Sequence, residues 1–324
     1  MRGHARALAL LLTLALGAGA AGCGSQSSAA QAHHGAQSSH GARSSASGHA
    51  GRVPAATVSR RPSGAPIVSE PGQLGPRWAA VATVGGAPAT WIDERSGVTL
   101  LRFNQQLVHL DLHAGSSEPE GRGWGYGDQI APSEVHRVIA AFNGGFKLDY
   151  GSVAFVSGGR VAVPLQAGLA SIVTYRNGVT AIAAWHEGVP APGLKIASVL
   201  QNLHLLVDHG VVAPTATSCV IACWGRTLGG GTDVPRSALG ITGEGQLVWA
   251  AGANLSPAAL GRAMAAAGVA RAVELDINPE WVAGYLYVHH GGGPTAVPVM
   301  PGQLGIPGHL LAPYSRDFFT IVAN

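Results

Sequence analysis

Residues 256–276 read SPAALGRAMAAAGVARAVELD, and this stretch is the strongest indication of the fold. Ser256 suits the N-cap of a helix, the proline after it suits the first turn, and Gly268 suits the C-terminal stop. Apolar side chains recur at helical spacing between these two ends. Ala270–Asp276 then forms a mainly apolar run, which predicts a buried strand. The stretch therefore predicts one capped helix that leads directly into a strand.

Most of the chain on either side shows β-type patterns. Three pairs of short apolar runs flank Gly-containing turns at 157–159, 176–178 and 243–245, which is typical of β-hairpins. The composition agrees, because the chain has 47 Gly and only 11% charged residues, a balance that favours strands joined by tight turns. We predict an α+β fold, a hairpin-rich mixed-sheet domain with few helices, over residues 71–324.

The N-terminal segment has the pattern of an export signal. Two arginines precede the apolar run Ala7–Leu16, and small residues follow up to Cys23. We predict a signal peptide over residues 1–22. Ala21-Gly22-Cys23 resembles the end of a bacterial lipobox, in which the cysteine is lipidated; an ordinary signal beside an incidental cysteine is the alternative. The protein is thus expected to be exported and anchored to the cell membrane by lipid, or secreted if Cys23 is not lipidated.

Residues 23–70 differ in composition from the rest of the chain. After Cys23 they are rich in Ser, Ala, Gly and His and contain almost no large apolar side chains. Such a segment cannot bury enough apolar surface to offset the entropy of ordering it. It is predicted to be a disordered tether between the membrane surface and the folded domain.

The two remaining cysteines and the charge balance limit the classes of partner. Cys219 and Cys223 lie four positions apart, and in an exported protein this spacing predicts a disulfide. A zinc site would need further Cys or His ligands close by, so no metal site is predicted.

The net charge is only +3 and no Lys/Arg run is present, which argues against a nucleic-acid partner.

Three segments together resemble a known family. They are AAFNGGF at 140–146, PRSALG at 235–240, and the helix at 256–268 followed by AVELD at 272–276. In this order they resemble the phosphodiester glycosidase family, whose best-known member removes N-acetylglucosamine from a phosphodiester. The resemblance covers roughly 133–324 and implies hydrolysis of a bond between a sugar and a phosphate.

One turn departs from the family pattern. After Leu-Asp the family usually continues with a Gly-rich turn, whereas this chain has Ile-Asn-Pro-Glu-Trp at 277–281. Glycines there would let the backbone approach a ligand closely. Pro279 instead fixes φ and removes an N–H donor, which makes a backbone anion site at this place less favourable. The fold expectation is unaffected, but the change in the turn leaves open whether catalysis is retained.

The expected reaction needs charge neutralisation on the phosphate, stabilisation of an oxocarbenium ion and activation of water. Arg236 suits the phosphate, because a guanidinium matches its oxygens in pairs; a structural ion pair is the alternative. Asp276 suits one of the other roles, since a carboxylate at the end of an apolar strand is costly unless paired or functional. Glu274, two positions earlier, is expected on the same face. The alternative for Glu274 is a surface pair with Arg271 or Arg262.

Two turns supply the predicted ligand contacts. Asn143, with the two glycines after it, is expected to hold a sugar hydroxyl or to present backbone N–H groups to a phosphate, with a simple tight turn as the alternative. Trp281 is expected to stack on a sugar face, with a place in the core as the alternative. The predicted substrate-binding residues are Gly144, Gly145, Asn278, Glu280 and Trp281.

These patterns lead to one principal function and one rival. We predict an exported lipoprotein that hydrolyses a glycosyl phosphodiester bond in envelope or extracellular glycans. The predicted catalytic residues are Asp276, Arg236, Asn143 and Glu274, with Glu280 as a second candidate for the helper carboxylate. The rival is a non-catalytic envelope lipoprotein that binds glycan or phosphate, keeps the fold and has lost the Gly-rich turn. A structural envelope protein without a ligand is the third possibility. The expected partners are a carbohydrate or sugar-phosphate substrate and the membrane, and the sequence indicates no particular cofactor.

Overall fold

The computed structural model describes residues 65–69, 78–227, 229–290 and 293–324. The predicted signal peptide, Cys23 and most of the predicted tether lie outside these ranges. Strand β1 (Ile67–Val68) falls within the last part of the predicted tether and pairs with β2 (Ala79–Val84), so the folded domain begins before residue 71. Within the described ranges, no helix combines the length and the apolar character that crossing a bilayer requires.

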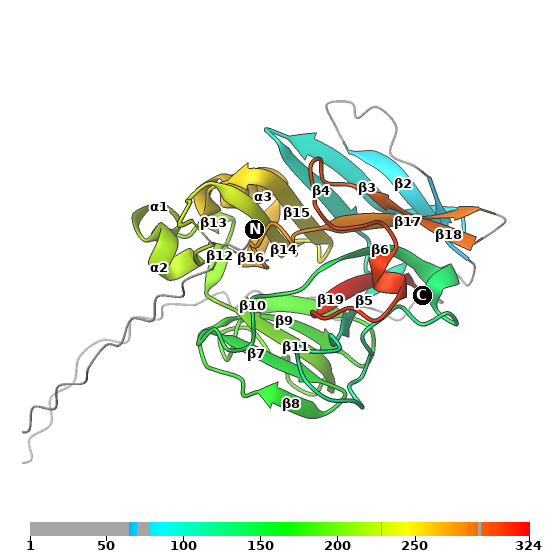
Figure 1. Ribbon diagram of the computed structural model, residues 1–324, viewed down its shortest axis with the longest axis horizontal. Coiled ribbons are helices and arrows are strands. Elements are labelled where there is room, and N and C mark those ends of the chain that lie inside the picture. Colours follow the sequence, from blue (N-terminus) through cyan, green and yellow to red (C-terminus); the bar gives the residue numbers. More distant parts are fainter. Residues whose placement is uncertain (1–64, 70–77, 228, 291–292) are drawn as a thin grey trace, which may run out of the picture. The chain divides into compact units, whose positions relative to one another are not determined.

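The described strands form three antiparallel sheets (Figure 1). Across the first sheet the order is β1, β2, β3 (Ala87–Arg95), β4 (Val98–Phe103), β15 (Leu247–Leu255), β14 (Val234–Thr242), β16 (Val269–Glu274), β12 (Leu205–Asp208) and β13 (Val211–Val212). Across the second it is β10 (Thr180–Ala184), β9 (Ala170–Tyr175), β11 (Ile196–Asn202), β7 (Val153–Ser157) and β8 (Arg160–Val163). Across the third it is β18 (Gly293–Pro298), β17 (Gly284–His290), β6 (Val138–Asn143), β19 (Phe318–Ala323) and β5 (Val108–His113).

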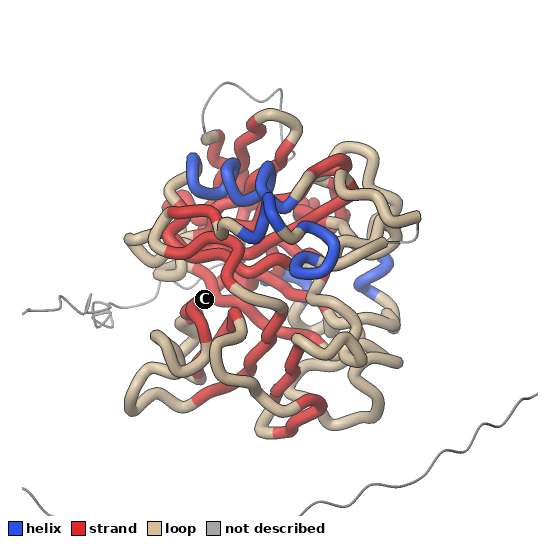
Figure 2. Tube along the Cα trace, turned by 90° about the vertical axis from the view of Figure 1, so that its left-hand side faces the viewer, coloured by secondary structure: helices blue, strands red, loops and turns tan. Residues whose placement is uncertain are grey.

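The prediction of an α+β fold with a mixed sheet is wrong. The described chain is mainly β, and its helices (blue in Figure 2) form a small share beside the strands (red). They are α1 (Thr215–Ser218), α2 (Val220–Trp224), α3 (Pro257–Ala266) and the 3₁₀ turns η1 (Val135–Arg137) and η2 (His309–Leu311). Helix α3 connects β15 to β16, which both pair antiparallel with β14 between them. The crossover therefore creates no parallel pair, and the single long helix does not form a layer of its own.

The local predictions around this crossover are confirmed. The Ser256 hydroxyl accepts a hydrogen bond from the Ala259 N–H at 3.2 Å and caps α3. Leu260 and Met264 are fully buried among apolar side chains from the first sheet. The three predicted hairpins are β7–β8, β9–β10 and β14–β15, each paired antiparallel.

Aromatic rings join the first and third sheets. The Phe142 ring of β6 lies 5.6 Å from Trp249 of β15, 6.3 Å from Phe103 of β4 and 5.7 Å from Phe319 of β19. All four side chains are buried, so these contacts combine area burial with favourable ring packing. The packing fixes the end of β6, from which the Asn143–Phe146 turn begins.

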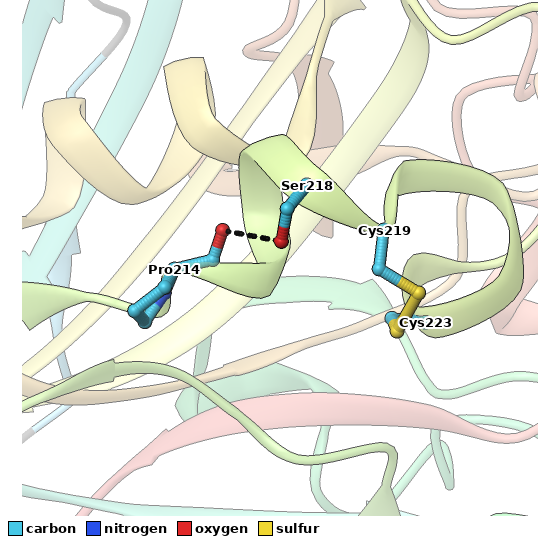
Figure 3. Close-up of a disulfide and its surroundings, with 4 residues drawn as sticks. All are labelled: Pro214, Ser218, Cys219 and Cys223. Atoms are coloured by element: carbon cyan, nitrogen blue, oxygen red, sulfur yellow. Dashed lines mark hydrogen bonds between the residues drawn. A yellow bond between two sulfur atoms is a disulfide. The ribbon is translucent and has the colours of Figure 1, made fainter.

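The predicted disulfide is confirmed between Cys219 and Cys223 (Figure 3). It spans α2, and the preceding Ser218 hydroxyl donates to the Pro214 carbonyl at 3.2 Å. Next to Cys223, Trp224 is buried in the cluster between α3 and the first sheet. The disulfide thus holds α2 where Trp224 enters the core.

Candidate active site

The turn after β6 joins three segments that are far apart in sequence. The Gly144 N–H donates to the Asp317 carbonyl at 3.1 Å, and the Gly145 N–H donates to Asp317 Oδ2 at 3.0 Å. The Gly144 carbonyl accepts from the Asp276 N–H at 3.0 Å. A side chain at Gly144 would place its Cβ 2.0 Å from Asp317 Oδ2, so only glycine leaves room for that carboxylate. The predicted turn therefore brings Asp276 and Asp317 to the same place.

One arginine connects three carboxylates at this turn. Arg316 Nη2 donates to Asp276 Oδ2 at 3.2 Å and to the Gly145 carbonyl at 2.8 Å, and it lies 3.7 Å from Asp317 Oδ1. Arg316 Nη1 pairs with Glu118 Oε2 at 3.3 Å. We call Glu118, Asp276, Arg316 and Asp317 the Arg316 cluster. Three carboxylates share one guanidinium, so the charges in the cluster do not balance if all four groups are ionised.

Burial raises the pKa of both aspartates of the cluster. Asp276 is 6% exposed and Asp317 is 2% exposed. Burial raises the pKa of Asp317 to about 7 and that of Asp276 to about 6, and the positive charge of Arg316 opposes the shift at both. Near neutral pH the pair can therefore hold one carboxylic acid and one carboxylate, the combination that acid–base catalysis uses.

The folded protein is expected to become more stable as the pH falls from 8 to about 6.5. Burial also raises the pKa of Glu274 to about 7, with Arg236 opposing. In the folded state these carboxyls have pKa values above their unfolded value of about 4, so their contribution to stability is lost as pH rises through about 7. Burial lowers the pKa of His113 to about 4, from an unfolded value of about 6.5. Below pH about 6.5 the unfolded state therefore binds this proton first, which opposes any further gain in stability.

Chemical denaturation at pH 8, 7 and 6.5 measures this effect. We expect the free energy of unfolding to be about 1 kcal/mol higher at pH 6.5 than at pH 8. Each carboxyl can contribute up to about 1.4 kcal/mol per pH unit, but Asp276 and Asp317 share one arginine, so their contributions do not simply add. Asp317→Asn should reduce the slope, since the amide does not titrate. A protein that is equally or more stable at pH 8 would contradict the prediction.

The turn at 277–281 covers the cluster. Asp276 Oδ1 accepts from the Asn278 N–H at 2.8 Å, and Asn278 Oδ1 accepts from the Glu280 N–H at 3.0 Å. The Trp281 ring lies over Arg316, 5.4 Å from its Cζ, and meets Tyr314 edge to face at 6.1 Å. Asn278 thus stabilises the turn, Glu280 points to solvent, and Trp281 is half-buried above the arginine.

Asn143 lies beside the cluster with its amide engaged. Its Nδ2 donates to Ser237 Oγ at 2.9 Å and to the Gly144 carbonyl at 3.0 Å, and its Oδ1 accepts from the Ala283 N–H at 3.4 Å. Ser237 Oγ in turn donates to the Asp276 carbonyl at 3.1 Å. This chain of hydrogen bonds favours a role for Asn143 in holding Asp276 over direct contact with a sugar.

Arg236 and Glu274 pair with each other and form no hydrogen bond or ion pair with the Arg316 cluster among the described residues. Their side chains are fully buried and form an ion pair at 2.8 Å between Arg236 Nη1 and Glu274 Oε1. The guanidinium also donates to the carbonyls of Leu255, Trp224 and Thr232. Glu274 therefore pairs in the core with Arg236, whereas the sequence alternative placed it at the surface with Arg271 or Arg262. Arg236 is enclosed by protein atoms and has no free path to a ligand.

A cavity of about 480 Å³ adjoins the cluster at Glu118. Lys147, Trp124 and Arg160 also line it, and the Arg160 guanidinium stacks over Trp124 at 4.1 Å. Glu118 accepts a hydrogen bond from the Leu148 N–H and pairs with Arg316, so it separates the cavity from the buried aspartates. The cavity offers cations, carboxylates and an aromatic ring, a set that suits a sugar carrying a phosphate.

Sequence patterns did not identify three residues of this site, namely Glu118, Arg316 and Asp317. Two adjacent charged residues directly before the mainly apolar stretch 318–323 were the available signal, because burying such a pair is costly without partners. Among the described residues, no three His, Cys, Asp or Glu side chains are grouped so that they could hold a metal ion.

Comparison with known proteins finds likeness in fold only. No protein-family model and no curated protein matches the sequence. Among solved structures, the catalytic domain of zebrafish N-acetylglucosamine-1-phosphodiester alpha-N-acetylglucosaminidase, auto-inhibited by its pro-peptide, matches at 14% identity with a TM-score of 0.46, covering 80% of this chain and 87% of that one. A hypothetical protein from Synechocystis matches at 13% identity and 0.38, covering 77% and 64%. A protein from Burkholderia pseudomallei described as exported matches at 11% and 0.30, covering 74% and 75%. All three TM-scores are low, and the likeness does not assign a function to this chain.

Proposed function

We propose that the protein hydrolyses a glycosyl phosphodiester bond in envelope or extracellular glycans. The observation that carries the proposal is the pair of buried aspartates, Asp276 and Asp317, which share Arg316 beside a polar cavity of sugar-phosphate size. Their raised pKa values supply an acid and a base at neutral pH. The resemblance of the 140–146, 235–240 and 256–276 segments to phosphodiester glycosidases agrees with this chemistry.

In this proposal the phosphate enters next to Lys147 and Arg160 and takes the place of Glu118 on Arg316. A phosphate oxyanion matches a guanidinium at least as well as a carboxylate does, and Glu118 reaches the cavity surface with about a fifth of its side chain exposed. Asp276, with the lower pKa, accepts a proton from water as it attacks the anomeric carbon. Asp317, with the higher pKa, donates a proton to the phosphate oxygen as the sugar–oxygen bond breaks.

The proposal is tested by sugar release from a panel of sugar-1-phosphodiesters incubated with the purified protein. Release of sugar and phosphomonoester in equal amounts supports it. A second candidate is a non-catalytic receptor for glycan or phosphate, favoured by the cover of Trp281 over Arg316 and the low exposure of Asp276. Saturable binding without turnover on any substrate would decide for the receptor.

We also propose export and lipid attachment at Cys23, from the apolar run at 7–16 and the lipobox-like Ala21-Gly22-Cys23. Cys23→Ser is expected to move the protein from the membrane fraction to the soluble extracellular or periplasmic fraction, because the lipid is then absent. Fractionation followed by immunoblotting measures this change. Equal membrane retention of both proteins would contradict lipid attachment at Cys23.

A further inference from the structure

A second cavity, of about 410 Å³, lies against a row of hydroxyl side chains. Ser198 of β11 is directly opposite Ser157 of β7 on one side and Thr174 of β9 on the other. Residues directly opposite one another in antiparallel strands point to the same face of the sheet. All three line the cavity, so its floor is a band of hydroxyls across three strands.

The Ser157 hydroxyl is buried and has no hydrogen-bond partner among the described residues. Thr174, by contrast, already pairs with Thr180 at 3.0 Å. A buried polar group without a partner is costly, and native structures usually satisfy such a group with protein, water or ligand. The unsatisfied hydroxyl makes this end of the cavity lining polar, which favours a polar occupant over an apolar one.

Strand β5 contributes a paired acid and base to the wall of this cavity. His109 Nε2 lies 3.4 Å from Asp111 Oδ2, and His109 Nδ1 lies 2.8 Å from Asn324 Oδ1. Tyr126 lines the same wall, and the exposed Arg176 stands at the rim. His109 and Asp111 pair with each other, so the cavity presents hydroxyl, imidazole and phenol groups beside a single paired carboxylate. This set suits the hydroxyls and ring face of a sugar.

The two cavities are neighbours. Trp124 lines the first and Gly125 lines the second, while the β7–β8 hairpin contributes Arg160 to the first and Ser157 to the second. Gly125 packs so closely on the hairpin that a Cβ there would lie 2.8 Å from Ser157 Oγ. A single chain of sugars running over this contact could occupy both cavities.

We propose that the second cavity binds one sugar residue of an extended glycan, next to the cavity at Glu118. The sugar site stands on its own residues, and only the extended chain rests on the proposed function. It follows that the protein prefers oligomeric glycans to single sugars, because a longer chain gains contacts in the second cavity.

Calorimetric titration of the full chain with uncharged trisaccharides of N-acetylglucosamine, glucose and mannose tests the proposal. At least one is expected to bind more tightly than its monosaccharide. Ser198→Ala should weaken that binding about 3- to 10-fold by removing one hydrogen-bonding group, and Ser198→Leu at least about tenfold by filling the cavity. Arg176→Ala changes only the exposed rim and should weaken binding about threefold or more. Thr217→Leu, an exposed change on α1, is the matched control and should leave the affinity unchanged.

Absence of trisaccharide binding to the unaltered protein would overturn the proposal, as would equal affinity in the Ser198 and Arg176 variants and the unaltered protein. Melting curves identify any variant that does not fold, and the exposed Arg176 change keeps the test available if Ser198→Leu fails. The two proposals separate clearly. Binding that depends on Ser198 without turnover retains the sugar site and rejects the hydrolase, whereas turnover with Ser198-independent binding does the reverse.

Discussion

Arg236→Ala is expected to lower the free energy of unfolding by about 3–5 kcal/mol. The side chain is fully buried, and its removal leaves the Glu274 carboxylate without its partner in the core. It also removes the donor from three backbone carbonyls, at Leu255, Trp224 and Thr232. For a domain of this size the melting temperature should fall by roughly 6–20 °C.

Arg271→Ala provides the matched control for this prediction. Arg271 lies on β16, the same strand as Glu274, but its pair with Asp208 at 3.2 Å is partly exposed on both sides. Such pairs are worth about 0–1 kcal/mol. Replacing both buried partners, as Arg236→Met with Glu274→Leu, should recover the part of the loss that comes from the unpaired carboxylate, whereas the three backbone carbonyls stay without their donor. If Arg236→Ala lowers the free energy of unfolding no more than Arg271→Ala does, the buried pair of Arg236 and Glu274 does not stabilise the fold as predicted.

Asp276→Asn and Asp317→Asn are each expected to lower kcat by about 10²- to 10⁴-fold, the usual effect of removing a general base or acid. Their pKa values of about 6 and about 7 also predict a bell-shaped pH dependence. The base is lost as pH falls below about 6, and the acid is lost as pH rises above about 7. Initial rates of sugar release between pH 5 and 9 measure both effects.

Asp149→Asn makes the same chemical change at an exposed carboxyl in the wall of the first cavity. It should keep kcat within about threefold, because it cannot transfer a proton at the buried end of the site. Retained activity in both Asp276→Asn and Asp317→Asn would reject the assigned roles. Loss of activity in Asp149→Asn alone would move the reaction to the outer cavity.

Local patterns predicted the elements of the fold better than their assembly. The capped helix at 256–268 and the three hairpins follow from spacing and turn residues, which act over a few positions. The division into three antiparallel sheets does not, because it depends on which strands pair across long stretches of chain. β14 lies between β15 and β16, and this arrangement removes the parallel pair that a helical crossover commonly makes.

The candidate site was predictable only in part, for a similar reason. The turn at Asn143–Phe146 and Asp276 could be found, because both end apolar strands. The same-face argument for Glu274 and Asp276 does not apply, since β16 ends at Glu274 and strand alternation ends with it. Arg316 and Glu118 meet Asp276 only through tertiary contacts, which no local pattern describes.

The position of β19 has a consequence for synthesis. Among the described strands it is the latest in the sequence, yet it lies inside its sheet, hydrogen-bonded to β6 on one side and β5 on the other. A nascent chain that lacks β19 cannot close the third sheet. The pairing of β19 with β5 also joins strands that are far apart in the sequence, and such pairings form slowly. Arg316 and Asp317 directly precede β19, so the Arg316 cluster is completed in the same step. A chain that has not yet added β19 would therefore have neither a closed third sheet nor a complete Arg316 cluster.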